Sequence, residues 1–132
     1  MAAIPANVLE LMKDREAVKA ISTVCAGNRP HTIVAGTIAP LGESQVMIGE
    51  VLMKKTAANL AKNPNASFSI IKGLQAYEIH CTLKEQVKAG PVFDAVKAEC
   101  DKMHLPLNSL YAFDVVSVYD QSAGPTCGKK LA

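Results

Sequence analysis

Alternating apolar and polar residues mark most of this chain as β-strand. Six segments either alternate in this way or are rich in β-branched residues, and turn-forming Gly, Pro, Asn and Ser separate most of them. Such segments are typical of strands with one face on a hydrophobic core. The predicted strands are residues 17–25, 31–39, 45–49, 67–72, 76–88 and 111–119.

Three further segments have the apolar spacing of helices. Residues 7–15 follow Pro5, a short helix begins near Thr56, and residues 91–104 form an amphipathic helix that opens with a proline. The short helix is expected to end at Asn63, because a proline disfavours helical conformation in the residue before it.

The order of these elements predicts a mainly β fold with inserted helices (α+β). Strands follow one another through short turns, and no regular alternation of strand and helix suggests a parallel Rossmann-type sheet. A six-stranded antiparallel barrel suits the pattern better, because closure removes exposed strand edges. The 132 residues are expected to form a single domain, residues 1–132.

Composition narrows the function classes. A net charge of +2, with no basic stripe interleaved with aromatic residues, argues against nucleic acid as a partner. No apolar run approaches the roughly 20 residues of a membrane span, and the first residues do not resemble a signal peptide. We therefore expect a cytoplasmic protein without membrane contact. Its four scattered cysteines are expected to be reduced thiols.

The stretch from Met47 to Leu60 carries an uncompensated positive charge. Thr56 is the predicted N-cap of the short helix, two lysines precede it, and no carboxylate occurs between Glu50 and Glu78. Acidic residues are the usual choice near a helix N-terminus. Two interpretations remain open from charge alone: both lysines extend into solvent, or they converge with backbone amides on a bound phosphate.

An ordered set of short motifs resembles the pyridoxamine 5′-phosphate oxidase-like family of FMN-binding split barrels. The chain is also close in length to the small bacterial FMN-binding proteins of that family. The set runs from about residue 29 to residue 67, and the similarity is looser beyond it. Its members are Arg29-Pro30-His31, Val46-Met47-Ile48-Gly49, Lys54-Lys55-Thr56 and Asn63-Pro64-Asn65-Ala66-Ser67.

The resemblance implies an antiparallel split barrel that forms a homodimer, with FMN at the subunit interface. It places the FMN phosphate at Lys54, Lys55 and Thr56. It places the flavin ring and ribityl chain along two backbone segments, in which Gly36 and Gly49 would allow close approach of a flat ring. The residues of these segments are Val34, Ala35, Gly36 and Thr37, followed by Ile48 and Gly49.

Two departures argue against oxidation of pyridoxamine phosphate itself. The oxidases have an arginine and a lysine at positions that match Ile33 and Ile38, and their C-terminal substrate-binding arginine and histidine have no counterpart in this chain. The resemblance therefore implies a small FMN-dependent oxidoreductase with an unidentified small molecule or redox protein as electron partner. The alternative is a non-catalytic electron carrier, or a binding protein for haem or a deazaflavin.

No residues stand out as a catalytic acid, base or nucleophile, and flavin reduction does not require one. Cys100 and His104 are spaced for one helix face, but no second pair of ligands accompanies them, so no metal site is expected. His80 and Cys81 are adjacent in a predicted strand and are expected to point to opposite faces.

Overall fold

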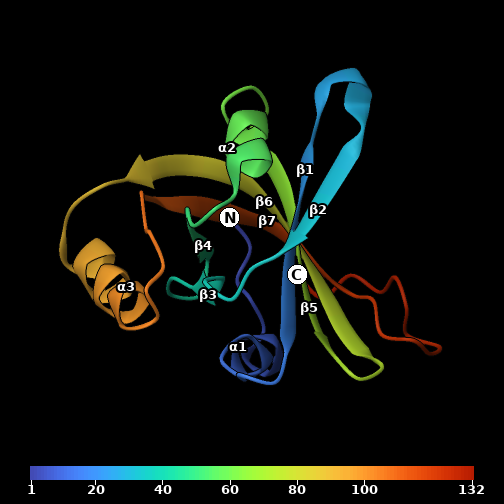
Figure 1. The fold of residues 1–132 in the computed structure, drawn as a ribbon. Helices are drawn as coiled ribbons and strands as arrows, with labels where there is room; N and C mark the ends of the chain where they lie inside the picture. Colours follow the sequence, from blue (N-terminus) through green and yellow to red (C-terminus); the bar gives the residue numbers. More distant parts are fainter.

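Seven antiparallel strands form one strongly curled sheet in the computed structural model, which describes all residues from Met1 to Ala132 (Figure 1). The strand order is β2-β1-β5-β6-β7-β4-β3. In chain order the elements are α1 (Ala6–Met12), β1 (Val18–Val24), the 3-10 turn η1 (Ala26–Asn28), β2 (Pro30–Val34), β3 (Ala39–Pro40), β4 (Gln45–Gly49), α2 (Lys54–Leu60), β5 (Asn65–Lys72), β6 (Gln75–Val87), α3 (Pro91–Lys102) and β7 (Leu110–Asp120).

The predicted fold class is confirmed, with seven strands in place of six. The predicted strand over residues 31–39 is interrupted, since β2 ends at Val34 and β3 begins at Ala39. In an unbroken strand Ile33 and Ile38 would point to opposite faces, because side chains alternate. The turn between β2 and β3 lets both isoleucines pack against the core, where Ile38 is only 1% exposed. The strands β2 and β3 are the two ends of the ladder, so the barrel is split there.

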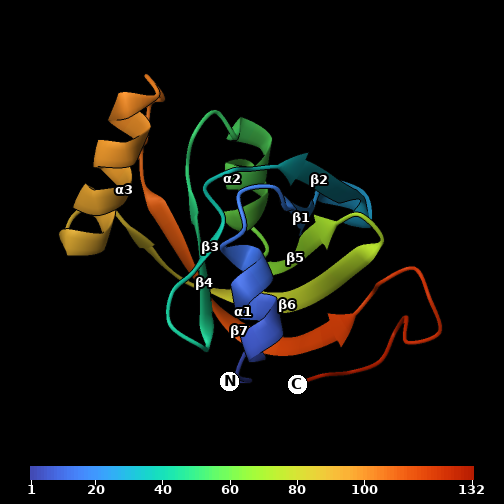
Figure 2. The same ribbon diagram turned by 90° about the horizontal axis from the view of Figure 1, so that it is seen from below.

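The main core fills the inside of the curl. Buried residues from the strands meet the apolar faces of α1 and α2, and the rings of Phe68 and Phe113 pack edge to face at a centroid distance of 5.1 Å. Figures 1 and 2 show α1 and α2 at two different sides of the curled sheet. The helix α1 contributes Val8, Leu11 and Met12 to this core, and α2 contributes Leu60.

The helix α3 stands apart from the main core, on the other side of β4 and β7 (Figures 1 and 2). It has a small core of its own, in which buried Cys100, Leu107 and Leu110 pack with apolar residues that include Met47 of β4. The connection from α3 to β7 runs through this second core. None of the three helices combines the length and apolar character that crossing a membrane requires.

Candidate functional site

The helix α2 begins earlier than its sequence predicts. Its first residue is Lys54, and Met53 occupies the N-cap position without any capping hydrogen bond from a side chain. The prediction that Thr56 caps the helix is wrong. Met53 is 5% exposed and packs in the main core with Leu60, so burial of these two residues determines where the helix lies and outweighs the capping preference of threonine.

Thr56 instead lies in the first turn of α2, with its side chain buried. The residue is 1% exposed, and its Oγ1 has no hydrogen-bond partner. It is the only buried side-chain oxygen or nitrogen in the chain without one. Leaving a buried hydroxyl unpaired costs about 1–3 kcal/mol, so native proteins rarely do so without a reason. A ligand that accepts a hydrogen bond from this hydroxyl supplies such a reason.

Lys54 and Lys55 directly precede Thr56 in the chain, and no ion pair neutralises their positive charge. Both are exposed, neither takes part in an ion pair, and the first turn of α2 contains no acidic residue. The backbone amides of the first three residues of the helix also lack an acceptor within the chain. Two ammonium groups, three amides and one hydroxyl thus lie in three consecutive residues, a donor set that suits a phosphate or carboxylate.

A polar cluster holds the segment that leads into α2. The hydroxyl of buried Ser109 donates to Glu50 Oε1 at 2.7 Å, and Gln86 Nε2 donates to Ser109 Oγ at 2.9 Å. The backbone repeats the connection, since the Glu50 amide donates to the Ser109 carbonyl at 2.7 Å and the Asn108 amide donates to the Glu50 carbonyl at 3.0 Å. The segment that leads into α2 is therefore attached to the α3–β7 connection. Sequence reasoning did not find this cluster, whose members come from three distant segments.

Thr37 fixes the residue just before this cluster. Its hydroxyl accepts a hydrogen bond from the Gly49 amide at 3.1 Å and lies 3.2 Å from the Gly49 carbonyl oxygen, to which it donates. A Cβ atom on Gly49 would lie 2.9 Å from Leu107 Cδ1 and 3.2 Å from Thr37 Cβ. Close packing within the chain is thus sufficient to explain the glycine at position 49, and the approach of a flat ring to this residue stays a prediction.

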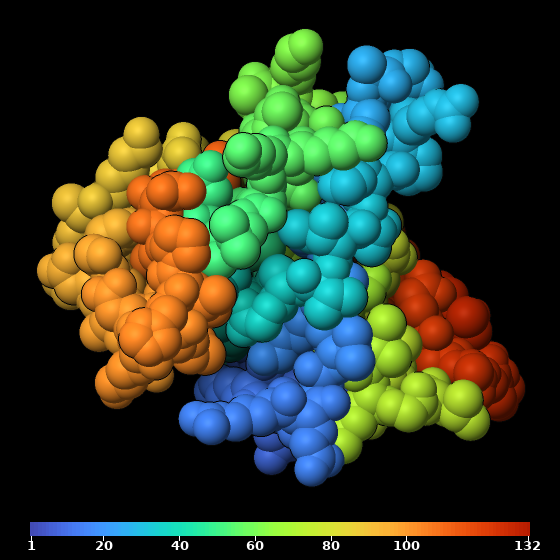
Figure 3. Space-filling view, viewed as in Figure 1, coloured from blue at the N-terminus to red at the C-terminus, as the bar shows by residue number.

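The remaining predicted flavin contacts have different degrees of access. Val34 is 71% exposed, Gly36 is exposed, and no atom lies within 4 Å of the Cβ position of Gly36, while Ala35 and Thr37 are half-buried. Ile48 is 0% exposed and packs in the main core, so neither its side chain nor its backbone is open to solvent in this structure. Figure 3 shows the segment after β2 and the start of α2 on the same face of the molecule.

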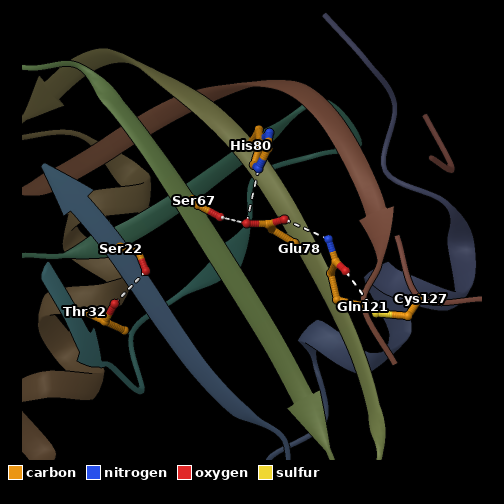
Figure 4. Close-up of polar contacts among 7 residues, drawn as sticks. All are labelled: Ser22, Thr32, Ser67, Glu78, His80, Gln121 and Cys127. Carbon is orange, nitrogen blue, oxygen red and sulfur yellow. Dashed lines mark hydrogen bonds and ion pairs between the residues drawn. The ribbon is translucent and has the colours of Figure 1, made fainter. Parts of the chain in front are cut away.

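The outer face of the sheet carries a second polar group, which sequence reasoning did not single out. Glu78 accepts hydrogen bonds from Ser67 at 2.8 Å and from Gln121 at 3.1 Å, and His80 Nε2 lies 3.2 Å from Glu78 Oε2 (Figure 4). Burial acts to raise the pKa of Glu78, but these hydrogen bonds and the charge of His80 outweigh it and hold the pKa below its usual value. As predicted, His80 faces outward while Cys81 is buried.

This outer face is lined by small residues and is partly hollowed. A depression of about 420 Å³ crosses β1, β5 and β6, with Ser22, Ser67 and His80 among the residues that line it. Ser22 Oγ lies 2.8 Å from Thr32 Oγ1 of the edge strand β2 (Figure 4). Strand alternation could have predicted that these serines face outward. Ser22 follows buried Ile21 and Ser67 precedes buried Phe68, so each points to the face opposite the core.

Comparison with solved structures identifies the architecture. HupZ of Group A Streptococcus superposes with a TM-score of 0.78 at 16% identity, covering 95% of this chain and 99% of that one. An FMN-binding protein from Syntrophomonas wolfei gives 0.75 at 18% identity, with coverages of 88% and 89%. A candidate pyridoxamine 5′-phosphate oxidase from Lactobacillus delbrueckii gives 0.71 at 16% identity, with coverages of 89% and 93%. The chain has the split-barrel fold.

The predicted resemblance to FMN-binding split barrels is therefore confirmed in the structure, at identities too low to carry function across by themselves. Other solved split barrels of this shape are described as an F420 reductase and as HutZ, the heme storage protein from Vibrio cholerae. No family model and no curated protein matches the sequence.

Proposed function

We propose that this split barrel binds FMN, with the phosphate at the start of α2, and acts as a small flavin-dependent oxidoreductase. The observation that carries the proposal is the buried hydroxyl of Thr56, which has no hydrogen-bond partner. It lies in the first turn of α2, directly after the two lysines that begin this helix. A phosphate oxygen accepts the hydrogen bond that Thr56 has no partner for. Lys54 and Lys55 then neutralise its charge.

The rest of the cofactor would lie along the two predicted backbone segments. Exposed Val34 and Gly36 leave room for a ring or ribityl chain, and Thr37 and Gly49 define the floor between the segments through their paired hydrogen bonds. Bound FMN would supply hydride or single-electron transfer. The chain would supply anchoring of the phosphate, shielding of the ring from water and the local charge that adjusts the ring's potential.

The proposal includes a homodimer, with the flavin at the subunit interface. Its support is the outer face of the sheet, where an open depression is lined by small side chains that include Ser22 and Ser67. Val116, on the same face, is 57% exposed. A second copy that packs on this face would bury these residues and enclose a ligand between the two sheets.

A second candidate function is a carrier without turnover, which holds FMN, haem or a deazaflavin. It is favoured by the solved split barrel that is described as a heme storage protein. The two candidates differ in the fate of the cofactor's electrons once it is bound. An oxidoreductase oxidises a donor repeatedly under multiple-turnover conditions, whereas a carrier exchanges at most the electrons of its bound cofactor.

Titration with FMN and with riboflavin tests the phosphate assignment directly, because the two ligands differ only in the phosphate. Replacing Lys54 and Lys55 by alanine is expected to weaken FMN binding roughly 100-fold, on the basis of about 1.5 kcal/mol for each charged hydrogen bond, and to leave riboflavin binding unchanged. The matched control removes two exposed lysines elsewhere, Lys84 and Lys88. Unchanged FMN affinity in K54A/K55A would contradict the assignment, and tight binding of haem without FMN would favour the carrier.

A further inference from the structure

A polar hollow of about 280 Å³ lies between the turn that joins β1 to β2 and the last part of α2. One wall is formed by residues 24–28, and the other by residues from the segment 58–63. Figures 1 and 3 show the β1–β2 hairpin, in blue to cyan, beside the green helix α2. The hollow is separate from the start of α2, where the FMN phosphate is proposed to bind.

Cys25 is held at this hollow by a side chain of α2. Its backbone is extended, with φ −82° and ψ 172°, and its amide donates to the Arg29 carbonyl at 2.7 Å. Cys25 therefore continues the alternation of β1 and faces the same side as Thr23. Asn59 Nδ2 donates to both residues, to Thr23 Oγ1 at 3.0 Å and to Cys25 Sγ at 3.4 Å. The half-buried thiol thus lies on the opposite side of β1 from the sheet face proposed for the dimer.

The side-chain carbonyl of Asn59 is left without a donor. Asn59 is 9% exposed, and its hydrogen bonds use Nδ2 and not Oδ1. Oδ1 is not sealed inside the protein, because Thr56 Oγ1 is the only fully enclosed side-chain oxygen or nitrogen without a partner. It therefore has access to the hollow that Asn59 lines. A nearly buried amide oxygen with no partner suits an N–H donor supplied by a ligand.

Lys62 gives the hollow a positive charge. It is the only charged residue among those that line the hollow, and no ion pair involves it. A positive charge here favours a ligand that carries a carboxylate. It also stabilises negative charge on a nearby sulfur, and the thiolate is the nucleophilic form of cysteine.

The other three cysteines lack this combination of features. Burial raises the pKa of Cys81 to about 12 and also raises the pKa of buried Cys100, which keeps both in the unreactive thiol form. Cys127 is exposed in the C-terminal tail, where its thiol donates to Gln121 Oε1 at 3.4 Å. Cys25 is the cysteine that shares a hollow with a cation and an unpaired acceptor.

We propose that Cys25 is a modification site that takes up a small thiol of the amino-acid or short-peptide class, with a carboxylate and an N–H donor, as a mixed disulfide. The Cys25 thiolate attacks one sulfur of the small molecule's disulfide. A new S–S bond forms, the original S–S bond breaks, and the released half leaves as a thiolate that takes the proton given up by Cys25. Cys25 is oxidised and the released half is reduced, so the small disulfide is the oxidant. The bound half places its carboxylate toward Lys62 and its N–H toward Asn59 Oδ1. The site does not depend on the proposed flavin function.

The test treats the full chain with N,N′-diacetylcystine, which has both groups, and with its dimethyl ester, which lacks the carboxylate charge. Trypsin places each of the four cysteines in a different peptide, so mass spectrometry gives a rate for each one. Each rate is divided by the rate of the same reagent with N-acetylcysteine amide. We expect Cys25 to react at least tenfold faster than Cys81 and Cys100. We expect its normalised rate to be roughly threefold higher with the acid than with the ester, which is the size of an exposed ion-pair effect.

Two lysine variants separate the charge of the hollow from general surface charge. K62Q should abolish the preference of Cys25 for the acid and leave the rates of Cys127 unchanged, whereas K84Q, which removes another exposed lysine, should keep the preference. 3,3′-Dithiodipropionate has the carboxylates without the N–H groups and should modify Cys25 more slowly than diacetylcystine.

Several results would overturn the proposal. One is a Cys25 peptide that stays unmodified, and another is modification of Cys25 at the rate of Cys81, because reaction would then proceed through unfolding. A preference for the acid that survives in K62Q would rule out Lys62 as the carboxylate partner. Equal normalised rates for dithiodipropionate and diacetylcystine would rule out the contact with Asn59.

Discussion

Replacing Thr56 by valine separates the ligand explanation of its buried hydroxyl from a purely structural one. Valine has nearly the same shape and also branches at Cβ, so the change removes the oxygen and little else. In the wild-type chain that oxygen is buried without a hydrogen bond. The ligand-free variant is therefore expected to be more stable by about 1–2 kcal/mol, because an unpaired polar group has been removed.

The same substitution is expected to act in the opposite direction on the cofactor. If the hydroxyl donates to the FMN phosphate, its loss removes one hydrogen bond to a charged group, which is worth about 1.5–3 kcal/mol, and FMN affinity falls about tenfold to a hundredfold. Riboflavin affinity should not change. Urea unfolding of the ligand-free protein and fluorescence titration with both flavins measure the two effects separately.

Thr23→Val is the matched control for this experiment. Thr23 is 2% exposed, and its Oγ1 accepts a hydrogen bond from Asn59 Nδ2 at 3.0 Å. Removing that oxygen leaves a buried amide short of a partner, so T23V should lower stability by about 1–2 kcal/mol without altering FMN affinity. A T56V protein that behaves like T23V, less stable and with unchanged FMN affinity, would refute the reasoning.

Two further predictions concern packing and pH. Gly49→Ala should reduce stability by about 1 kcal/mol or more, because its Cβ would meet Leu107 and Thr37 at 2.9 and 3.2 Å. Gly36→Ala should be nearly neutral, because the space around Gly36 is open. Urea unfolding compares the two variants, and equal stabilities would contradict the packing argument. The pKa of Glu78 is lower in the folded protein than in the unfolded chain, so ionised Glu78 stabilises the fold. This contribution is fully present above the unfolded-state pKa of Glu78 and is lost as pH falls through its folded-state pKa. Wild-type stability should therefore fall more steeply than that of E78Q between about pH 5 and pH 3. Parallel slopes for these two proteins would show that the Glu78 hydrogen bonds do not matter to the fold.

Local pattern was sufficient for most of the fold because it records which side of each strand is buried. The strand over residues 76–88 was predicted within one residue at each end, as Tyr77, Ile79 and Cys81 alternate with polar neighbours. The break between Val34 and Ala39 escaped this reasoning. Nothing local distinguishes Thr37 from a strand residue, and its role depends on hydrogen bonds to Gly49, 12 residues further along the chain.

The candidate site, like the fold, could be predicted from the sequence only in part. The unbalanced charge of Lys54 and Lys55 is visible in the sequence, since it requires only the absence of nearby acids. The position of Thr56 is not, because the start of α2 is determined by the burial of Met53 in a core built from the whole chain. The attachment of Glu50 to Ser109 joins residues 59 positions apart and could be found only in the folded structure.

That attachment gives a physical connection between the start of α2 and the helix α3. The segment between them includes Leu107, which packs in the small core under α3, and Ser109, which holds Glu50. Coupling between two equilibria is reciprocal, so if the α3–β7 connection favours the binding-competent form of the Lys54 segment, an anion bound there must equally favour the docked form of α3. An anion bound at the start of α2 would thus be expected to stabilise the packing of α3, although this helix belongs to the small core and not to the main one.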